Sequence, residues 1–205
     1  MGAAHARRPR RPFSWTHCYL KRIARSEWRT HVLGGGTWPK VAFAGRSKLH
    51  PGAQYDLAEA LLSAGRYDEA ARRCERIPAD INWRSECLGR ALTAQGRANE
   101  AVQILTPPPL GHWGYLAYAY AKAGRRAEAE KLIAEAPTHQ SMTGPWNYTI
   151  AFAGLGDKDR TIEQLERMAG VGPVRMGMTL NRPEFAFVRN DPRVILLRKK
   201  VGLPK

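Results

Sequence analysis

The sequence predicts an all-α fold, a solenoid of about four helix pairs closed by a C-terminal capping helix. Three observations predict it. A short motif centred on glycine recurs four times, at intervals of 31, 28 and 32 residues. A small residue follows each glycine by five positions, and prolines separate the units. Internal repeats of about this length are typical of stacked helical units.

The repeated motif interrupts sequence that otherwise favours helix. Its copies are LLSAGRYDEAARRCERIP (61–78), LTAQGRANEAVQILTP (92–107), YAKAGRRAEAEKLIAEAP (120–137) and FAGLGDKDRTIEQLERMAG (152–170). Glycine inside a helix is unfavourable by roughly 1 kcal/mol relative to alanine. Between two helices, however, it supplies the left-handed or tight-turn conformation that lets the second helix fold back. The turn glycines are Gly65, Gly96, Gly124 and Gly156.

The small residues after these glycines mark helix crossings, because a large side chain there would push the two helices apart. They are Ala70, Ala101, Ala129 and Thr161. Apolar residues recur at helical spacing on both sides of the first turn, with Leu57 and Leu61 before it and Cys74 and Ile77 after it. The prolines that end the units are Pro78, Pro107, Pro137 and Pro145.

Over residues 51–170 these features resemble the tetratricopeptide repeat (TPR), a helix-turn-helix unit of about 34 residues. The resemblance implies a right-handed array of TPR-like helix pairs over residues 51–174. The units of this chain are shorter than the family's, and Thr161 stands where alanine is usual. The family's small positions in the first helices fall at Ala58, Gly89, Ala117 and Thr149. Its large positions before the turns fall at Leu61, Leu92, Tyr120 and Phe152.

Residues 175–205 are predicted to form the capping segment. The end of the chain, PEFAFVRNDPRVILLRKKVGLPK, resembles the closing segment of certain bacterial TPR-containing regulators. Asn190 or Asp191 can cap a helix that has Pro192 in its first turn. Its apolar face would consist of Val194, Leu196 and Leu197, and would cover the last repeat, because a stacked array leaves its end exposed.

The resemblance also implies that the first helices line a concave groove where a partner peptide or protein binds. Aromatic and arginine side chains are the usual anchors of such interfaces. An alternative is that the aromatic residues only fill the space between units. The predicted partner-binding residues are Tyr55, Glu59, Trp83, Glu86, Arg90, Tyr118, Lys122, Trp146 and Ile150. Leu62 occupies a further groove position of the first helix.

Charge is distributed unevenly along the chain. Residues 1–50 hold eleven Lys or Arg and one acid, residues 51–174 hold fourteen bases and fifteen acids, and residues 175–205 hold eight bases and two acids. We expect residues 1–50 to be largely disordered. Their bases alternate with tryptophan and tyrosine, a pattern that suits nucleic acid or an anionic membrane surface. A tail without a role, or a misassigned start, stays open.

Signatures of chemistry are scarce. No histidine pair has the spacing of a metal-binding helix, and neither GxSxG nor HExxH occurs. Asp157 and Asp159 are expected to cap a helix, and His112 to open one. The three cysteines lack CxxC spacing, so we expect reduced thiols in a cytoplasmic protein, and no apolar stretch is long enough to span a membrane. We therefore predict no enzyme activity, no cofactor and no metal.

Three functions remain to be compared. The first is a non-catalytic scaffold that binds a protein or peptide on the concave face of the array. The second is a regulator whose basic N-terminus contacts nucleic acid while the repeats recruit or sense a partner. The third is an enzyme. The sequence favours the first, and it leaves open the partner, the oligomeric state and whether the chain is a fragment of a larger regulator.

Overall fold

The computed structural model describes residues 50–108, 111–136 and 144–203. The predicted basic segment of residues 1–50 lies outside these ranges except for His50, and the predicted helix breaker Pro137 lies outside them too. Residues 48–205 form one compact unit of the chain. In the described residues the chain forms helices and connecting turns without strands, which confirms the predicted all-α, TPR-like solenoid.

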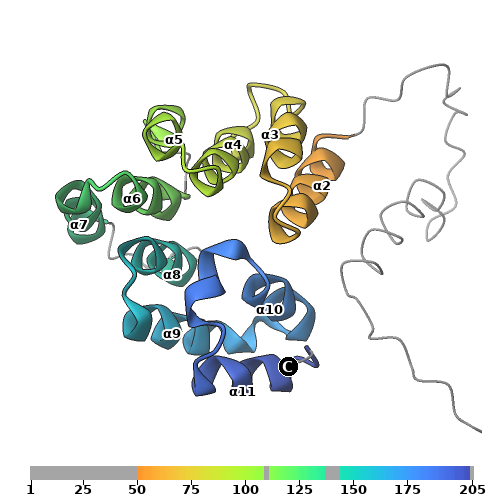
Figure 1. The fold of residues 1–205 in the computed structure, drawn as a ribbon, viewed down its shortest axis with the longest axis vertical. Helices are drawn as coiled ribbons and strands as arrows, with labels where there is room; N and C mark the ends of the chain where they lie inside the picture. Colours follow the sequence, from red (N-terminus) through yellow and green to blue (C-terminus); the bar gives the residue numbers. More distant parts are fainter. Residues whose placement is uncertain (1–49, 109–110, 137–143, 204–205) are drawn as a thin grey trace, which may run out of the picture. The chain divides into compact units, whose positions relative to one another are not determined.

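The array consists of four consecutive helix pairs. They are α2 (Pro51–Ser63) with α3 (Tyr67–Glu75), α4 (Trp83–Ala94) with α5 (Ala98–Leu105), α6 (Trp113–Lys122) with α7 (Arg126–Glu135), and α8 (Gly144–Leu155) with α9 (Lys158–Arg167). The first helices pack on one another, α2 on α4, α4 on α6 and α6 on α8. Figure 1 shows α4 and α6 on the inner side of the array and α5 and α7 on the outer side.

The turn within each pair has the same geometry. The four turn glycines have φ of 73°, 80°, 78° and 72°, in the left-handed region that favours glycine. The residue after each glycine donates its backbone N–H to the carbonyl five residues earlier, as in the bond from Arg66 to Leu61 at 2.9 Å. The equivalent bonds join Arg97 to Leu92, Arg125 to Tyr120 and Asp157 to Phe152. Each bond satisfies a carbonyl that the helix end would leave unpaired.

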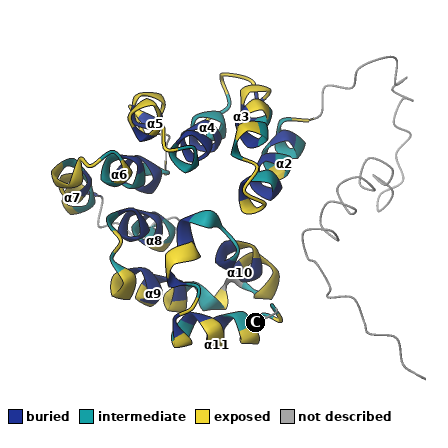
Figure 2. Ribbon diagram, in the orientation of Figure 1, coloured by how far each residue is buried: buried dark blue, intermediate teal, exposed yellow. Residues whose placement is uncertain are grey.

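The small residues lie in the core. Ala70, Ala101, Ala129 and Thr161 are fully buried, and Figure 2 shows the buried faces of α4, α6 and α8 turned toward one another, with exposed residues on the outer faces of α5 and α7. The backbones of α6 and α8 approach each other closely. A Cβ added at Gly114 would lie 2.4 Å from the Asn147 carbonyl oxygen, so glycine is required for this crossing.

The C-terminal segment, residues 173–203, is more elaborate than one capping helix. A 3-10 helix, η1 (Met168–Val171), precedes α10 (Pro173–Leu180), η2 (Pro183–Val188) and α11 (Pro192–Lys200). As predicted, Asp191 caps α11, accepting a bond from the Arg193 amide at 2.9 Å. The predicted apolar face needs one correction, because Leu196 is 60% exposed while Val194 and Leu197 are buried. Positions two apart point to nearly opposite sides of an α-helix.

The cysteine prediction was wrong. Cys74 at the end of α3 and Cys87 in α4 form a disulfide whose Cα atoms are 5.5 Å apart. Thirteen residues of sequence separate them, so no spacing motif marks the pair, and the packing of α3 on α4 brings the two side chains together. Disulfides are rare in the cytosol, so the cysteines no longer support the prediction of a cytoplasmic protein.

Candidate functional site

The inner face of the array, formed by α2, α4 and α6, gathers four of the predicted partner-binding residues into one polar cluster. Glu59 comes from α2, and Glu86 and Arg90 come from α4 one turn apart. Arg90 is 5% exposed and pairs with Glu59, while its contact with Glu86 is longer, at 3.9 Å. Tyr55 donates its hydroxyl hydrogen bond to Glu86 Oε1 at 2.7 Å.

Two residues of the C-terminal segment complete this cluster. Arg90 Nε donates to Glu184 Oε1 at 2.6 Å, in a pair that is almost wholly buried. Arg182 reaches Glu59 Oε2 at 3.0 Å and donates to the Tyr115 hydroxyl at 2.8 Å. The chain's own C-terminal segment therefore occupies part of the face on which a partner was predicted to bind.

Aromatic side chains enclose the charged groups. The Arg182 guanidinium lies 4.7 Å from the ring centre of Trp146, and the ring of Phe185 meets Trp146 edge-on with centres 6.0 Å apart. The Arg90 guanidinium lies 5.4 Å from the ring centre of Tyr115. Cation–π and edge-to-face contacts of this kind stabilise arginine in surroundings with little water.

The electrostatics of the cluster follow from burial and pairing. Burial alone would raise the pKa of Glu184, but Arg90 and Arg182 hold the pKa below its ordinary value. Burial would likewise lower the pKa of Arg182, but Tyr115, Tyr55 and Glu184 raise it. Burial raises the pKa of Tyr115 to about 12. The carboxylate and both guanidinium groups are therefore charged at neutral pH.

Further side-chain contacts extend the cluster toward the start of α6. His112 Nδ1, at the N-terminal end of α6, lies 3.0 Å from Glu86 Oε2. The rings of Tyr55 and Trp83 meet edge-on with centres 5.3 Å apart, and burial raises the pKa of Tyr55. Glu86 thus links α2, α4 and α6.

Part of the inner face stays open as a pocket of about 230 Å³. Lys122 is exposed at its rim, with its ammonium 5.3 Å from the ring centre of Tyr118. Burial raises the pKa of Tyr118, which keeps its hydroxyl protonated and able to donate. The pocket is lined by Tyr67, Arg90, Thr93, Ala94, Tyr118, Lys122, Pro183 and Glu184.

The predicted site residues therefore lie in three settings. Glu59, Glu86 and Arg90 are buried in the charged cluster, and Ile150 is fully buried in the hydrophobic core with Leu116 and Leu165. The residues that keep some exposure on or beside the inner face are Tyr55, Trp83, Tyr118, Lys122 and Trp146.

The prediction missed the residues that meet this face from elsewhere in the chain. Arg182, Glu184 and Phe185 come from the C-terminal segment, and Tyr115 and His112 come from α6 and its N-cap. One signal pointed to Glu184. It is one of only two acids in the basic last 31 residues, and an isolated acid beside apolar residues is a candidate partner for a buried arginine.

Comparison with known proteins identifies the first helix pair. Residues 51–76, which span α2 and α3, match the family model described as tetratricopeptide repeat. This first helix pair is therefore identified as a TPR unit. The turn bond and buried small residue of this first TPR recur in the three later pairs. No curated protein matches the chain, and no solved structure matches it.

The inner face of this TPR-like array offers paired charges, tyrosine hydroxyls and aromatic rings, which are common at recognition surfaces. Among the described residues, no group of three His, Cys, Asp or Glu side chains could hold a metal ion. In the same part of the chain, no helix combines the length and apolar character needed to cross a bilayer.

Proposed function

We propose that this protein is a non-catalytic scaffold that binds a partner peptide or protein on the inner face of its TPR array. TPR units typically mediate protein–protein interaction. The observation that carries the proposal is the open pocket between α4, α6 and the C-terminal segment, where Tyr118 and Lys122 remain accessible next to the buried charged cluster.

The pocket favours a partner segment with an acidic or hydrogen-bond-accepting side chain. Lys122 supplies a positive charge at the rim, and the Tyr67 and Tyr118 rings supply apolar area with hydroxyl donors. Tyrosine contributes large contact area with little loss of side-chain entropy, which is why it is frequent at binding hot spots. Arg90 and Glu184 hold the floor of the pocket in place rather than contacting the partner as free charges.

The test begins with capture of partners by the full chain and identification of what co-purifies. Tyr118→Ala and Lys122→Glu are then expected to weaken the captured partner tenfold or more, by at least ~1.4 kcal/mol each. Lys131→Glu is the matched control, because Lys131 is also an exposed lysine but lies on α7. Equal binding by all three variants would show that the partner binds elsewhere.

A second candidate function rests on the charge of the N-terminus. Eleven Lys or Arg against one acid in residues 1–50 favour contact with nucleic acid phosphates. Under this proposal the repeats recruit a partner to the bound nucleic acid. Deletion of residues 1–50 should then abolish nucleic acid binding, and the affinity of the intact chain should fall steeply as salt rises. An intact chain that ignores nucleic acid at low salt would exclude this function.

A further inference from the structure

Exposed large apolar side chains concentrate at the C-terminal end of the described chain. Within that chain six large hydrophobic residues are exposed, and five of them belong to the C-terminal segment, while Ile104 lies on α5. These five are Val174, Met178, Phe187, Ile195 and Leu196. The two on α11 are 44% and 60% exposed. Single exposed apolar residues are normal on a protein surface, but neighbouring ones such as the pair on α11 are candidates for a contact surface.

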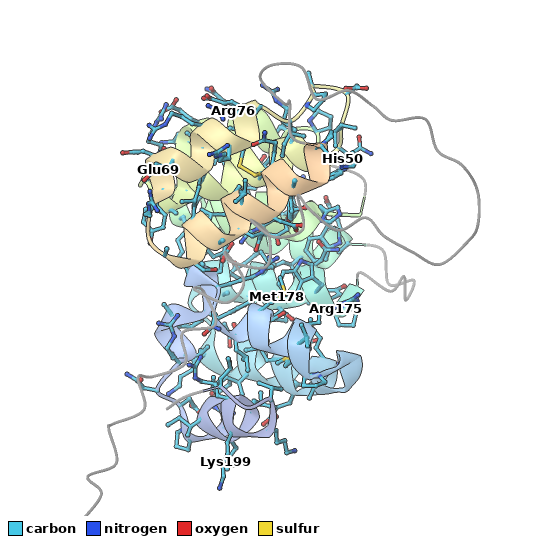
Figure 3. The ribbon with its side chains drawn as sticks, turned by 90° about the vertical axis from the view of Figure 1, so that its right-hand side faces the viewer. His50, Glu69, Arg76, Arg175, Met178 and Lys199 are labelled. Atoms are coloured by element: carbon cyan, nitrogen blue, oxygen red, sulfur yellow. A yellow bond between two sulfur atoms is a disulfide. The ribbon has the colours of Figure 1, made fainter. Side chains whose placement is uncertain are left out.

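The outer face of α11 combines apolar and basic side chains. Val194 and Leu197 point into the core, so Ile195 and Leu196 face away from it. Lys199 and Lys200 follow one turn later on the same sides of the helix and are exposed. Figure 3 shows Lys199 projecting from α11 away from the rest of the unit.

This face carries no acid of its own. Within α11, Arg193, Arg198, Lys199 and Lys200 are basic and no residue is acidic. The capping Asp191 is 7% exposed and pairs with Lys158 at 3.0 Å. On the neighbouring helix α9, Asp159 bonds Arg193 at 2.8 Å and Glu163 bonds Arg167 at 2.6 Å.

The helix dipole accounts for only part of this pattern. Basic side chains in the last turn are favourable because they face the negative end of the helix. The dipole gives no reason for Ile195 and Leu196 to be exposed beside them. A binding partner whose surface accepts both aliphatic and basic side chains would explain why the two occur together.

We propose that the outer face of α11 binds an anionic membrane surface. Aliphatic side chains enter the interface between headgroups and acyl chains, and lysines extend their ammonium groups to anionic headgroups. A second copy of the chain that bound through the same face of α11 would bring like charges together. Nucleic acid phosphates would match the lysines but not the aliphatic side chains. This role is separate from the pocket on the inner face.

The experiment measures sedimentation of the full chain with vesicles of phosphatidylcholine alone or mixed with phosphatidylglycerol. The full chain is expected to bind the mixed vesicles and not the neutral ones. Lys199→Glu with Lys200→Glu should lower the partition coefficient about fivefold or more for each lysine replaced. Ile195→Ser with Leu196→Ser should lower it severalfold.

Control variants distinguish vesicle binding by this face from nonspecific binding. The basic N-terminus is unchanged in every variant, so differences between variants do not come from it. Lys131→Glu on α7 and Ile104→Ser on α5 replace exposed residues of the same types and should bind as the original chain does. Thermal melts by circular dichroism verify that each variant is folded. Absence of vesicle binding, leaving an acidic protein groove as the occupant, overturns the proposal. Full binding by both α11 double variants also overturns it, as does a loss of binding in the double lysine variant without any loss in the Ile195 and Leu196 variant.

Discussion

Arg90 is the side chain through which the repeats and the C-terminal segment are joined. Its guanidinium pairs with Glu59 of α2 and with Glu184 of η2, and lies beside the ring of Tyr115 from α6. Removing one member of a buried ion pair leaves the others without compensation, which is more unfavourable than losing the pair as a whole. The residue was predicted to contact a partner, yet its contacts in the structure are internal.

Replacing Arg90 should therefore destabilise the fold. Arg90→Met keeps the length of the side chain but leaves Glu59 and Glu184 buried without their cation. We expect the free energy of unfolding, measured by urea denaturation, to fall by about 3–5 kcal/mol. In Arg126→Met, which breaks the exposed pair between Arg126 and Glu130 on α7, the loss should be about 1 kcal/mol or less. Similar losses in the two variants would refute the internal role of Arg90.

Glu184 should make stability depend on pH in the acid range. Its pKa is lowered in the fold from the ordinary value of 4.5. Between these two pKa values the unfolded chain binds the proton and the folded chain does not, so stability falls as pH falls through this window. Urea unfolding followed from neutral to acid pH should show a shallower decline for Glu184→Gln, with lower stability at neutral pH. Parallel profiles for the two proteins would contradict this assignment.

At the scale of helices, α6 and α8 cross so closely that two glycines are needed at their contact. A Cβ at Gly154 would lie 2.6 Å from the Cα of Tyr118, and one at Gly114 would meet the backbone of Asn147. Asn147 also bonds across the crossing, accepting from the Gly114 amide at 2.9 Å and donating to the Gly111 carbonyl at 2.8 Å. The Asn147 side chain is therefore buried between the two helices.

This crossing gives a direct packing prediction. Gly154→Ala adds one methyl group at the contact and should lower the free energy of unfolding by about 1–3 kcal/mol, because the helices must separate. Gly144→Ala is the control, since nothing lies within 4 Å of a Cβ at that position of α8. Thermal melts should show destabilisation in the first variant only. A neutral Gly154→Ala would mean that α6 and α8 are farther apart than the structure places them.

The disulfide joins two adjacent helices and can be tested chemically. Alkylation of the denatured chain before reduction should leave Cys74 and Cys87 unmodified in peptide mass spectra, and both should react after reduction. Cys74→Ser with Cys87→Ser should lower the free energy of unfolding by about 2–4 kcal/mol under oxidising conditions. Reaction of both cysteines without reductant would contradict the bond.

Local sequence predicted the helix pairs better than it predicted what covers them. Turn glycines, small crossing residues and helix caps such as Asp157 act within a few positions along the chain, so periodicity reveals them. The contact between Arg90 and Glu184 spans 94 positions, and the pairing of Cys74 with Cys87 depends on packing between units. Neither leaves a periodic signal. Ile150 was placed at the groove by its repeat position, but it is buried in the hydrophobic core.

At the scale of the whole described unit, the C-terminal segment is part of the hydrophobic core rather than a lid over it. Met176, Phe185 and Val188 are buried in the same cluster as Leu116 and Ile162 of the array. Stacked repeats need such an end because a single unit cannot bury its apolar face alone. The remaining opening of the inner face is therefore shaped by both the repeats and the C-terminal segment.

The most direct test of this account is a double-mutant cycle between Arg90 and Glu184, using Arg90→Met, Glu184→Gln and the double variant in urea unfolding. If the C-terminal segment occupies the inner face, the two substitutions should be coupled by about 1–3 kcal/mol, because the double variant removes both buried charges together. Additive losses, agreeing within about 0.5 kcal/mol, would show that the two residues are not in contact. That result would contradict the account.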